Sequence, residues 1–178
     1  MNEKFDKDIK TKYLATNGIL LALNLITIVL INYIPTNTIA LMAVSSLFMA
    51  VAIIESNIKF GSIFCVASIL FAFILINNKL HFIVYAFTFG NYAIIKYLIE
   101  SKVRKIKFQY MIKFIYSICA FSALYLVSTA FFDKTILNNS LTIFLPVILI
   151  FAYFLYDYLF TMFIEKYNSQ FKKMFHRK

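Results

Sequence analysis

The chain has 178 residues, of which 62% are hydrophobic and 15% are charged, and its formal net charge is +10. A soluble domain is nearer half apolar and a quarter charged, so a soluble fold of this length could not bury so much apolar surface. A lipid bilayer solvates such surface directly, and we therefore expect an integral membrane protein with one domain over residues 1–178. The basic side chains lie between and beside apolar segments, which is how membrane topology places them, and we expect no nucleic-acid partner.

Six apolar segments approach the roughly 20 residues that a helix needs to cross the hydrocarbon core. In chain order they are residues 13–33, 38–54, 60–76, 82–98, 111–132 and 141–164. Five residues join the second segment to the third, which predicts a tight helical hairpin. The sequence thus predicts an all-α bundle of six transmembrane helices.

The basic residues predict the orientation of this bundle. With the N-terminus in the cytoplasm, sixteen of the 18 Lys and Arg residues fall on the cytoplasmic side, and only Lys79 and Lys134 fall outside. This is the positive-inside pattern, and it requires an even number of crossings. We therefore expect both termini in the cytoplasm and only short connections outside.

Small residues recur at helical spacing, and such stripes allow helices to approach closely in lipid. On the first helix the stripe comprises Ala15, Gly18 and Ala22. Stripes on the next three helices comprise Ala43, Ser46 and Ala50; Gly61, Cys65, Ser68 and Ala72; and Ala86, Gly90 and Ala93. Packing inside the bundle explains most of them. A stripe that stays exposed would dock a partner membrane protein, and the stripe on the first helix is the best candidate.

Asp157 is the clearest ionisable residue at membrane depth, where a charge is costly unless it is paired. Tyr153 lies one helical turn above it and Thr161 one turn below. Lys96 and Lys113 lie at comparable depth on the fourth and fifth helices. Asp157 is therefore either half of a buried ion pair that ties helices together or part of a substrate or proton site.

Three asparagines also lie deep within the apolar segments, whereas Asn32 and Asn37 lie near the outer surface. Asn17 and Asn24 are seven residues apart on one face of the first helix, and Asn91 lies near the middle of the fourth. They are interpreted either as amide bonds between helices or as the lining of a pocket for a polar small molecule. The candidate substrate-binding residues are accordingly Asn24, Asn91, Tyr153 and Asp157.

No residue pattern points to catalysis. The two histidines, His81 and His176, cannot form a metal site within the membrane, and Cys65 and Cys119 have no metal-ligand spacing. No metalloprotease, hydrolase or nucleotide-binding motif occurs. We expect no enzyme, no metal and no cofactor.

Six short helices, cytoplasmic termini, small outer loops and the sequence Gly18-x-x-x-Ala22 preceded by Ala15 together resemble the S components of energy-coupling-factor (ECF) transporters. These are the substrate-binding membrane subunits of vitamin uptake systems. The resemblance implies that the first-helix stripe contacts a transmembrane coupling subunit, which works with ATPase subunits. It also implies a small-molecule pocket near the outer side, under the loop of Pro35, Thr36 and Asn37.

Residues 12–100 also look like YybS-like and other small membrane proteins of low-GC Gram-positive bacteria, and the abundance of Lys, Ile, Asn and Phe suits such a genome. This similarity implies a bacterial cytoplasmic membrane as the location.

Three hypotheses for the function follow. The first is a solute-binding subunit of a micronutrient uptake transporter, which predicts a cavity in the outer leaflet. The second is a scaffold without solute, similar to the small membrane subunit MreD of the cell-elongation machinery, which predicts a filled bundle. The third is a membrane enzyme or proton-coupled carrier centred on Asp157, in which Asp157→Asn abolishes activity and leaves the fold intact.

Overall fold

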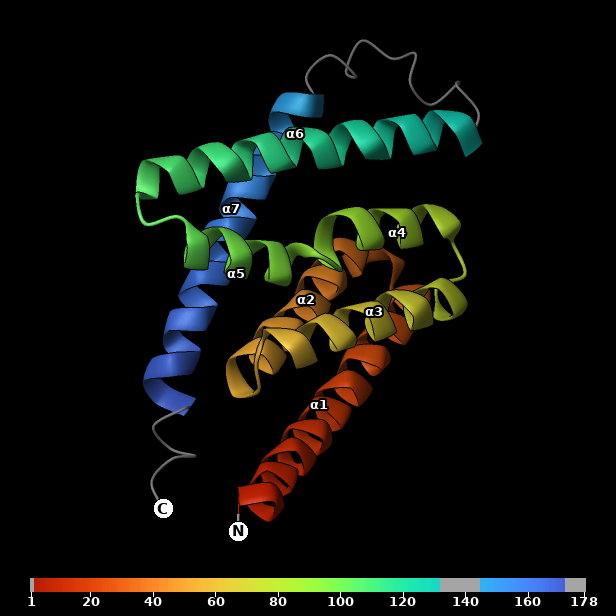
Figure 1. The fold of residues 1–178 in the computed structure, drawn as a ribbon. Coiled ribbons are helices and arrows are strands. Elements are labelled where there is room, and N and C mark those ends of the chain that lie inside the picture. The colour runs from red at the N-terminus through yellow and green to blue at the C-terminus, as the bar shows by residue number, and fades with distance from the viewer. Residues whose placement is uncertain (1, 132–144, 172–178) are drawn as a thin grey trace. The chain divides into compact units, whose positions relative to one another are not determined.

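The computed structural model describes residues 2–131 and 145–171, and all regular structure in these two ranges is helical (Figure 1). The elements in chain order are α1 (Asn2–Tyr33), the 3-10 turn η1 (Pro35–Asn37), α2 (Thr38–Glu55), α3 (Ile58–Leu75), α4 (Lys79–Val84), the π-helix η2 (Tyr85–Phe89), α5 (Tyr92–Lys102), α6 (Ile106–Phe131), α7 (Leu145–Lys166) and the π-helix η5 (Tyr167–Phe171).

Six helical stretches among the described residues are long and apolar enough to cross a membrane. They are Lys10–Tyr33, Pro35–Glu55, Ile58–Leu75, Lys79–Lys102, Ile106–Val127 and Ile148–Gln170. The prediction of an all-helical chain with six such helices is therefore confirmed for this part of the protein. It indicates a multi-pass membrane protein, whereas the orientation of the termini stays a prediction.

The helices depart from the predicted segments in two ways. First, α1 begins at Asn2 and α6 at Ile106, before the apolar segments expected from residues 13 and 111. Lys and Glu are good helix formers, so the helices continue into the polar flanks. Second, the helix predicted over residues 82–98 is divided into α4, η2 and α5. Residues 132 and 141–144 of the predicted segments lie outside the described residues.

The chain divides into two compact units, Met1–Tyr110 and Met111–Lys178. In the first unit α1 packs against α2 and α3, and α5 and η2 pack against α2 (Figure 1). The core of this unit consists of the buried residues Ile28, Ile31, Met42, Ala72, Ile76 and Tyr85. In the second unit Phe114 of α6 stacks on Phe154 of α7, with ring centroids 6.4 Å apart. The expectation of a single domain stays a prediction.

The predicted hairpin between α2 and α3 is as tight as expected, because only Ser56 and Asn57 separate the two helices. The side chain of Asn57 accepts hydrogen bonds from the backbone N–H groups of Lys59 and Phe60, at 3.0 and 3.1 Å. This is an N-cap, which satisfies two donors that the first turn of a helix leaves free. Gly61 follows in the first turn, where α3 meets the end of α2.

Gly61 provides the first test, because a Cβ atom there would lie 2.4 Å from Cγ1 of the buried Ile53. Overpacking of this kind costs about 1–3 kcal/mol, so Gly61→Ala should lower the melting temperature of the purified protein in detergent. Gly18→Ala is the matched control, since a Cβ at Gly18 meets no atom within 4 Å. Equal melting temperatures for the two variants would contradict the close approach of α2 and α3.

Candidate functional site

A cluster of four buried polar side chains lies inside the first unit. Its centre is Asn24 of α1, whose Nδ2 donates a hydrogen bond of 2.6 Å to Oγ of Ser68 on α3. Oγ of Ser45 on α2 donates to Oδ1 of Asn24 and lies 3.0 Å from the hydroxyl oxygen of Tyr85, the first residue of η2. The cluster therefore joins four helical segments through side-chain hydrogen bonds alone.

The number of hydroxyl protons in the cluster indicates which group donates in the hydrogen bond between Ser45 and Tyr85. A serine hydroxyl carries one proton and has two lone pairs. Because Ser45 gives its proton to Asn24, the hydroxyl of Tyr85 can act as the donor to Ser45. All four residues are fully buried or nearly so, and in a bilayer no water can replace a missing partner. Loss of one side chain would therefore leave its buried partners without a hydrogen bond, which is costly.

The fourth candidate span is interrupted next to this cluster. The backbone N–H of Gly90 bonds to the carbonyl of Tyr85 at 2.6 Å, five residues earlier, and a Cβ at Gly90 would lie 3.1 Å from that oxygen. Nδ2 of Asn91 then donates to the carbonyl of Ala86 at 2.9 Å. Glycine therefore fits the crowded turn, and Asn91 satisfies a carbonyl at the break. Such π-helical segments occur frequently at functional sites.

Cys65 of α3 contacts the same break. Its Sγ lies 3.2 Å from the carbonyl oxygen of Gly90 and 3.5 Å from Oδ1 of Asn91. Cys65 and Ser68 are three residues apart and lie on one buried face of α3. Asn24 and Asn91 therefore both bond to the buried small-residue stripe of α3. Asn24 bonds to Ser68, and Asn91 bonds to Cys65.

Asn17 is buried without being satisfied. The residue is 8% exposed, and Nδ2 donates to the backbone carbonyl of Tyr13 at 2.8 Å, whereas Oδ1 has no hydrogen-bond partner within the part of the chain that the structure describes. Both Asn17 and Asn24 lie in the core, as their spacing predicts, but only Asn24 bonds to another helix.

The second unit contains a buried ion pair. Nζ of Lys113 on α6 lies 3.0 Å from both Oδ1 and Oδ2 of Asp157 on α7, and each side chain is 5% exposed. The hydroxyl of Thr161 bonds to the backbone carbonyl of Asp157 at 2.8 Å. The predicted pairing of Asp157 with a lysine is therefore confirmed for Lys113. Lys96, the other lysine considered, forms an ion pair of 2.9 Å with Glu100.

The four predicted substrate-binding residues fall into two groups. Asn24 and Asn91 belong to the first unit, and Tyr153 and Asp157 lie one turn apart on α7 in the second. Tyr153 is half-buried, with its ring centroid 6.4 Å from that of Tyr116. A common pocket for all four stays a prediction. The hydrogen bonds of Ser45 and Tyr85 in the polar cluster were not predicted from the sequence. Both residues lie within apolar spans, where a polar group needs a partner.

An apolar groove of about 480 Å³ lies between the C-terminal halves of α1 and α3. It is lined by Leu25, Ile26, Val29, Leu30, Tyr33, Phe71 and Leu75. A groove with such a lining suits hydrocarbon or another apolar side chain rather than a polar solute.

The small residues of α1 face away from the other helices of the first unit. Ala15, Gly18 and Ala22 are exposed, whereas the α3 stripe of Gly61, Cys65, Ser68 and Ala72 is buried. A helix brings every third or fourth residue to one face, and Ile26, Val29 and Tyr33 of the groove continue the face that begins at Ala15. We call this face, which comprises Ala15, Gly18, Ala22, Ile26, Val29 and Tyr33, the outward face of α1.

Comparison of the chain with protein-family models, with curated proteins and with solved structures found no match.

Replacement of Asn24 tests the polar cluster. Asn24→Leu removes two interhelical bonds and leaves Ser45 and Ser68 without these partners, so we expect a loss of about 1–2 kcal/mol in unfolding free energy. Asn17→Leu, on the same face of the same helix, removes only a bond within α1 and should cost much less. Unfolding of both variants in detergent measures the difference, and equal losses would contradict the role of the cluster.

A double-mutant cycle tests the ion pair. Asp157→Leu or Lys113→Met leaves one buried group without its partner, which costs about 3–5 kcal/mol. Replacement of both by Lys113→Met and Asp157→Leu should cost less than either single change. Thermal unfolding of the three variants measures the coupling, and strictly additive losses would show that the two charges act independently.

Proposed function

We propose that this chain is a non-enzymatic membrane subunit that docks a partner membrane protein through the outward face of α1. The observation that carries the proposal is the exposure of Ala15, Gly18 and Ala22, in contrast to the buried stripe of α3 in the same unit. Small residues at this spacing let two helix backbones approach closely in lipid. Gly18 offers the closest approach, because the space beyond its Cα is open.

The outward face is long enough for a complete transmembrane helix. Ala15 and Tyr33 are 18 residues apart, which corresponds to about 27 Å along the helix axis. The half near Ala15 and Gly18 carries small residues, and the half near Val29 and Tyr33 borders the apolar groove. A partner helix would place small side chains against the first half and a larger apolar side chain in the second.

The partner that we propose follows from the resemblance to S components. It is the transmembrane coupling subunit of a micronutrient uptake transporter, in a bacterial cytoplasmic membrane, with both termini of this chain in the cytoplasm. In this role the chain would bind the solute. The break at Gly90 and Asn91 supports that role, because interrupted helices near mid-membrane are a common way to build solute sites in transporters.

A scaffold of the cell envelope is the second candidate, and a different observation favours it. Asn24, Ser45, Ser68 and Tyr85 satisfy one another, and the groove beside α1 is apolar. A first unit in which polar groups serve packing is what a scaffold similar to MreD requires. Both candidates use the outward face of α1, and they differ in whether a solute is bound.

Affinity purification of the tagged protein in mild detergent, with mass spectrometry of proteins and small molecules, tests the proposal. Ala22→Leu adds bulk to the outward face and should reduce recovery of the partner by about tenfold, the loss expected if roughly 1.4 kcal/mol of helix packing is removed. Ala152→Leu makes the same change at an exposed alanine of α7 and should leave recovery unchanged.

The identity of the recovered molecules separates the two candidates. A coupling subunit with ATPases, or a bound vitamin-like molecule, supports the solute-binding subunit, and envelope proteins without a small molecule support the scaffold. Unchanged recovery with Ala22→Leu, together with a lower melting temperature, would show that the outward face packs inside the chain. That result would overturn the docking proposal.

A further inference from the structure

The turn between α5 and α6 carries the densest positive charge among the described side chains. Lys102, Arg104, Lys105 and Lys107 occur within six residues, and all four are exposed. The next acidic residue along the sequence after Glu100 is Asp133. We call residues 102–108 the basic turn.

The four cations have no partner among the described residues. No hydrogen bond or ion pair joins their side chains to another group there, and the adjacent Glu100 is 2.9 Å from Nζ of Lys96. The backbone of the turn, in contrast, is restrained by a hydrogen bond from a side chain. Nε2 of Gln109 donates to the carbonyl of Val103 at 2.6 Å. The turn thus presents four unneutralised charges from a defined backbone.

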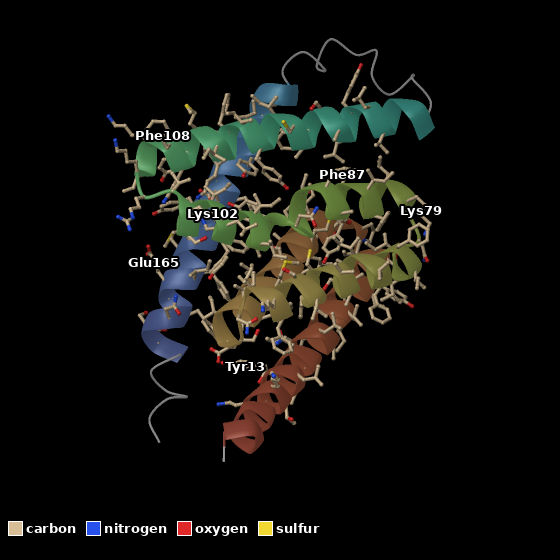
Figure 2. The ribbon with its side chains drawn as sticks, viewed as in Figure 1. Tyr13, Lys79, Phe87, Lys102, Phe108 and Glu165 are labelled. Carbon is tan, nitrogen blue, oxygen red and sulfur yellow. The ribbon has the colours of Figure 1, made fainter. Side chains whose placement is uncertain are left out.

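Apolar side chains alternate with these charges. Ile106 is 67% exposed and Phe108 is 51% exposed, and Figure 2 shows Lys102 and Phe108 on either side of the same turn. The turn also lies between two candidate membrane spans, one that ends at Lys102 and one that begins at Ile106. A turn between two spans of a bilayer lies at the depth where phospholipid headgroups meet the hydrocarbon core.

Topology alone would explain a few lysines at this position. It would not explain exposed apolar side chains interleaved with four cations that have no partner in residues 2–131 and 145–171. Clusters of four or more basic residues beside a transmembrane helix attract anionic lipids. Among the four, the guanidinium group of Arg104 is suited to bind a phosphate through two parallel hydrogen bonds.

We propose that the basic turn binds the headgroup of an anionic phospholipid. The four cations contact the phosphate and any further negative charge of the headgroup, and Ile106 and Phe108 lie against the upper part of the acyl chains. This inference goes beyond the proposed function and is independent of it, because it uses neither the outward face of α1 nor a solute.

Native mass spectrometry of the full chain in detergent tests the proposal, with phosphatidylglycerol as the anionic probe and phosphatidylcholine as the neutral one. The unmodified protein should retain phosphatidylglycerol in preference. Substitution of Lys102, Arg104, Lys105 and Lys107 by Gln should reduce this preference by about tenfold or more. The matched control replaces Lys4, Lys7, Lys10 and Lys12 by Gln, which removes the same charge, and it should keep the preference.

Equal loss in both variants would show a general charge effect and would overturn the proposal, as would an unchanged preference in the basic-turn variant. A salt titration of the unmodified protein gives a measurement that does not depend on the folding of any variant. Because salt screens exposed charges, the preference should fall as salt rises, and a preference insensitive to salt would contradict the proposal. Displacement of the lipid by equimolar inorganic phosphate would identify a soluble-anion site instead.

Discussion

The structure of the first unit depends on one constraint, which is that a polar group in the hydrocarbon core must find its partner within the protein. Asn24 is where this constraint acts most directly. Its amide is a donor and an acceptor at once, and it bonds to Ser68 of α3 and Ser45 of α2. Tyr85 joins the same cluster, so α1, α2, α3 and η2 are aligned by a single group of hydrogen bonds. Apolar packing alone would leave the rotation of each helix less restricted, since lipid tails solvate an apolar side chain as well as a neighbouring helix does.

Much of the fold follows from the sequence because span length and apolar composition are local properties. The tight hairpin and the six long helices required only the positions of the apolar segments. The break in the fourth span was not predicted, because residues 82–98 are mostly apolar and only Gly90 and Asn91 mark the position of the break. A π-helix forms where tertiary contacts compensate for its less regular backbone, and those contacts, from Cys65 and Ser45, come from distant parts of the chain.

The candidate site could be predicted only in part for the same reason. A charge within an apolar span must be paired, so the need of Asp157 for a lysine was evident from its position. The choice of Lys113 required the relative height and rotation of α6 and α7. The roles of Ser45 and Ser68 depend on helix rotation even more strongly, because a serine in an apolar helix can bond to its own backbone instead, as Ser46 does with the carbonyl of Ala43.

The π-helix that begins at Tyr85 changes the phase of the fourth span. A π turn contains one residue more than the α turn that it replaces, and one residue corresponds to about 100° of rotation in an α-helix. The buried face of α5, which includes Tyr92, Ala93 and Lys96, is therefore offset from the direction that α4 would give it in an uninterrupted helix. Insertion or removal of one residue in this span would rotate the faces of α5 about the helix axis. The number of residues between Tyr85 and Tyr92 therefore decides which side chains of α5 face the core.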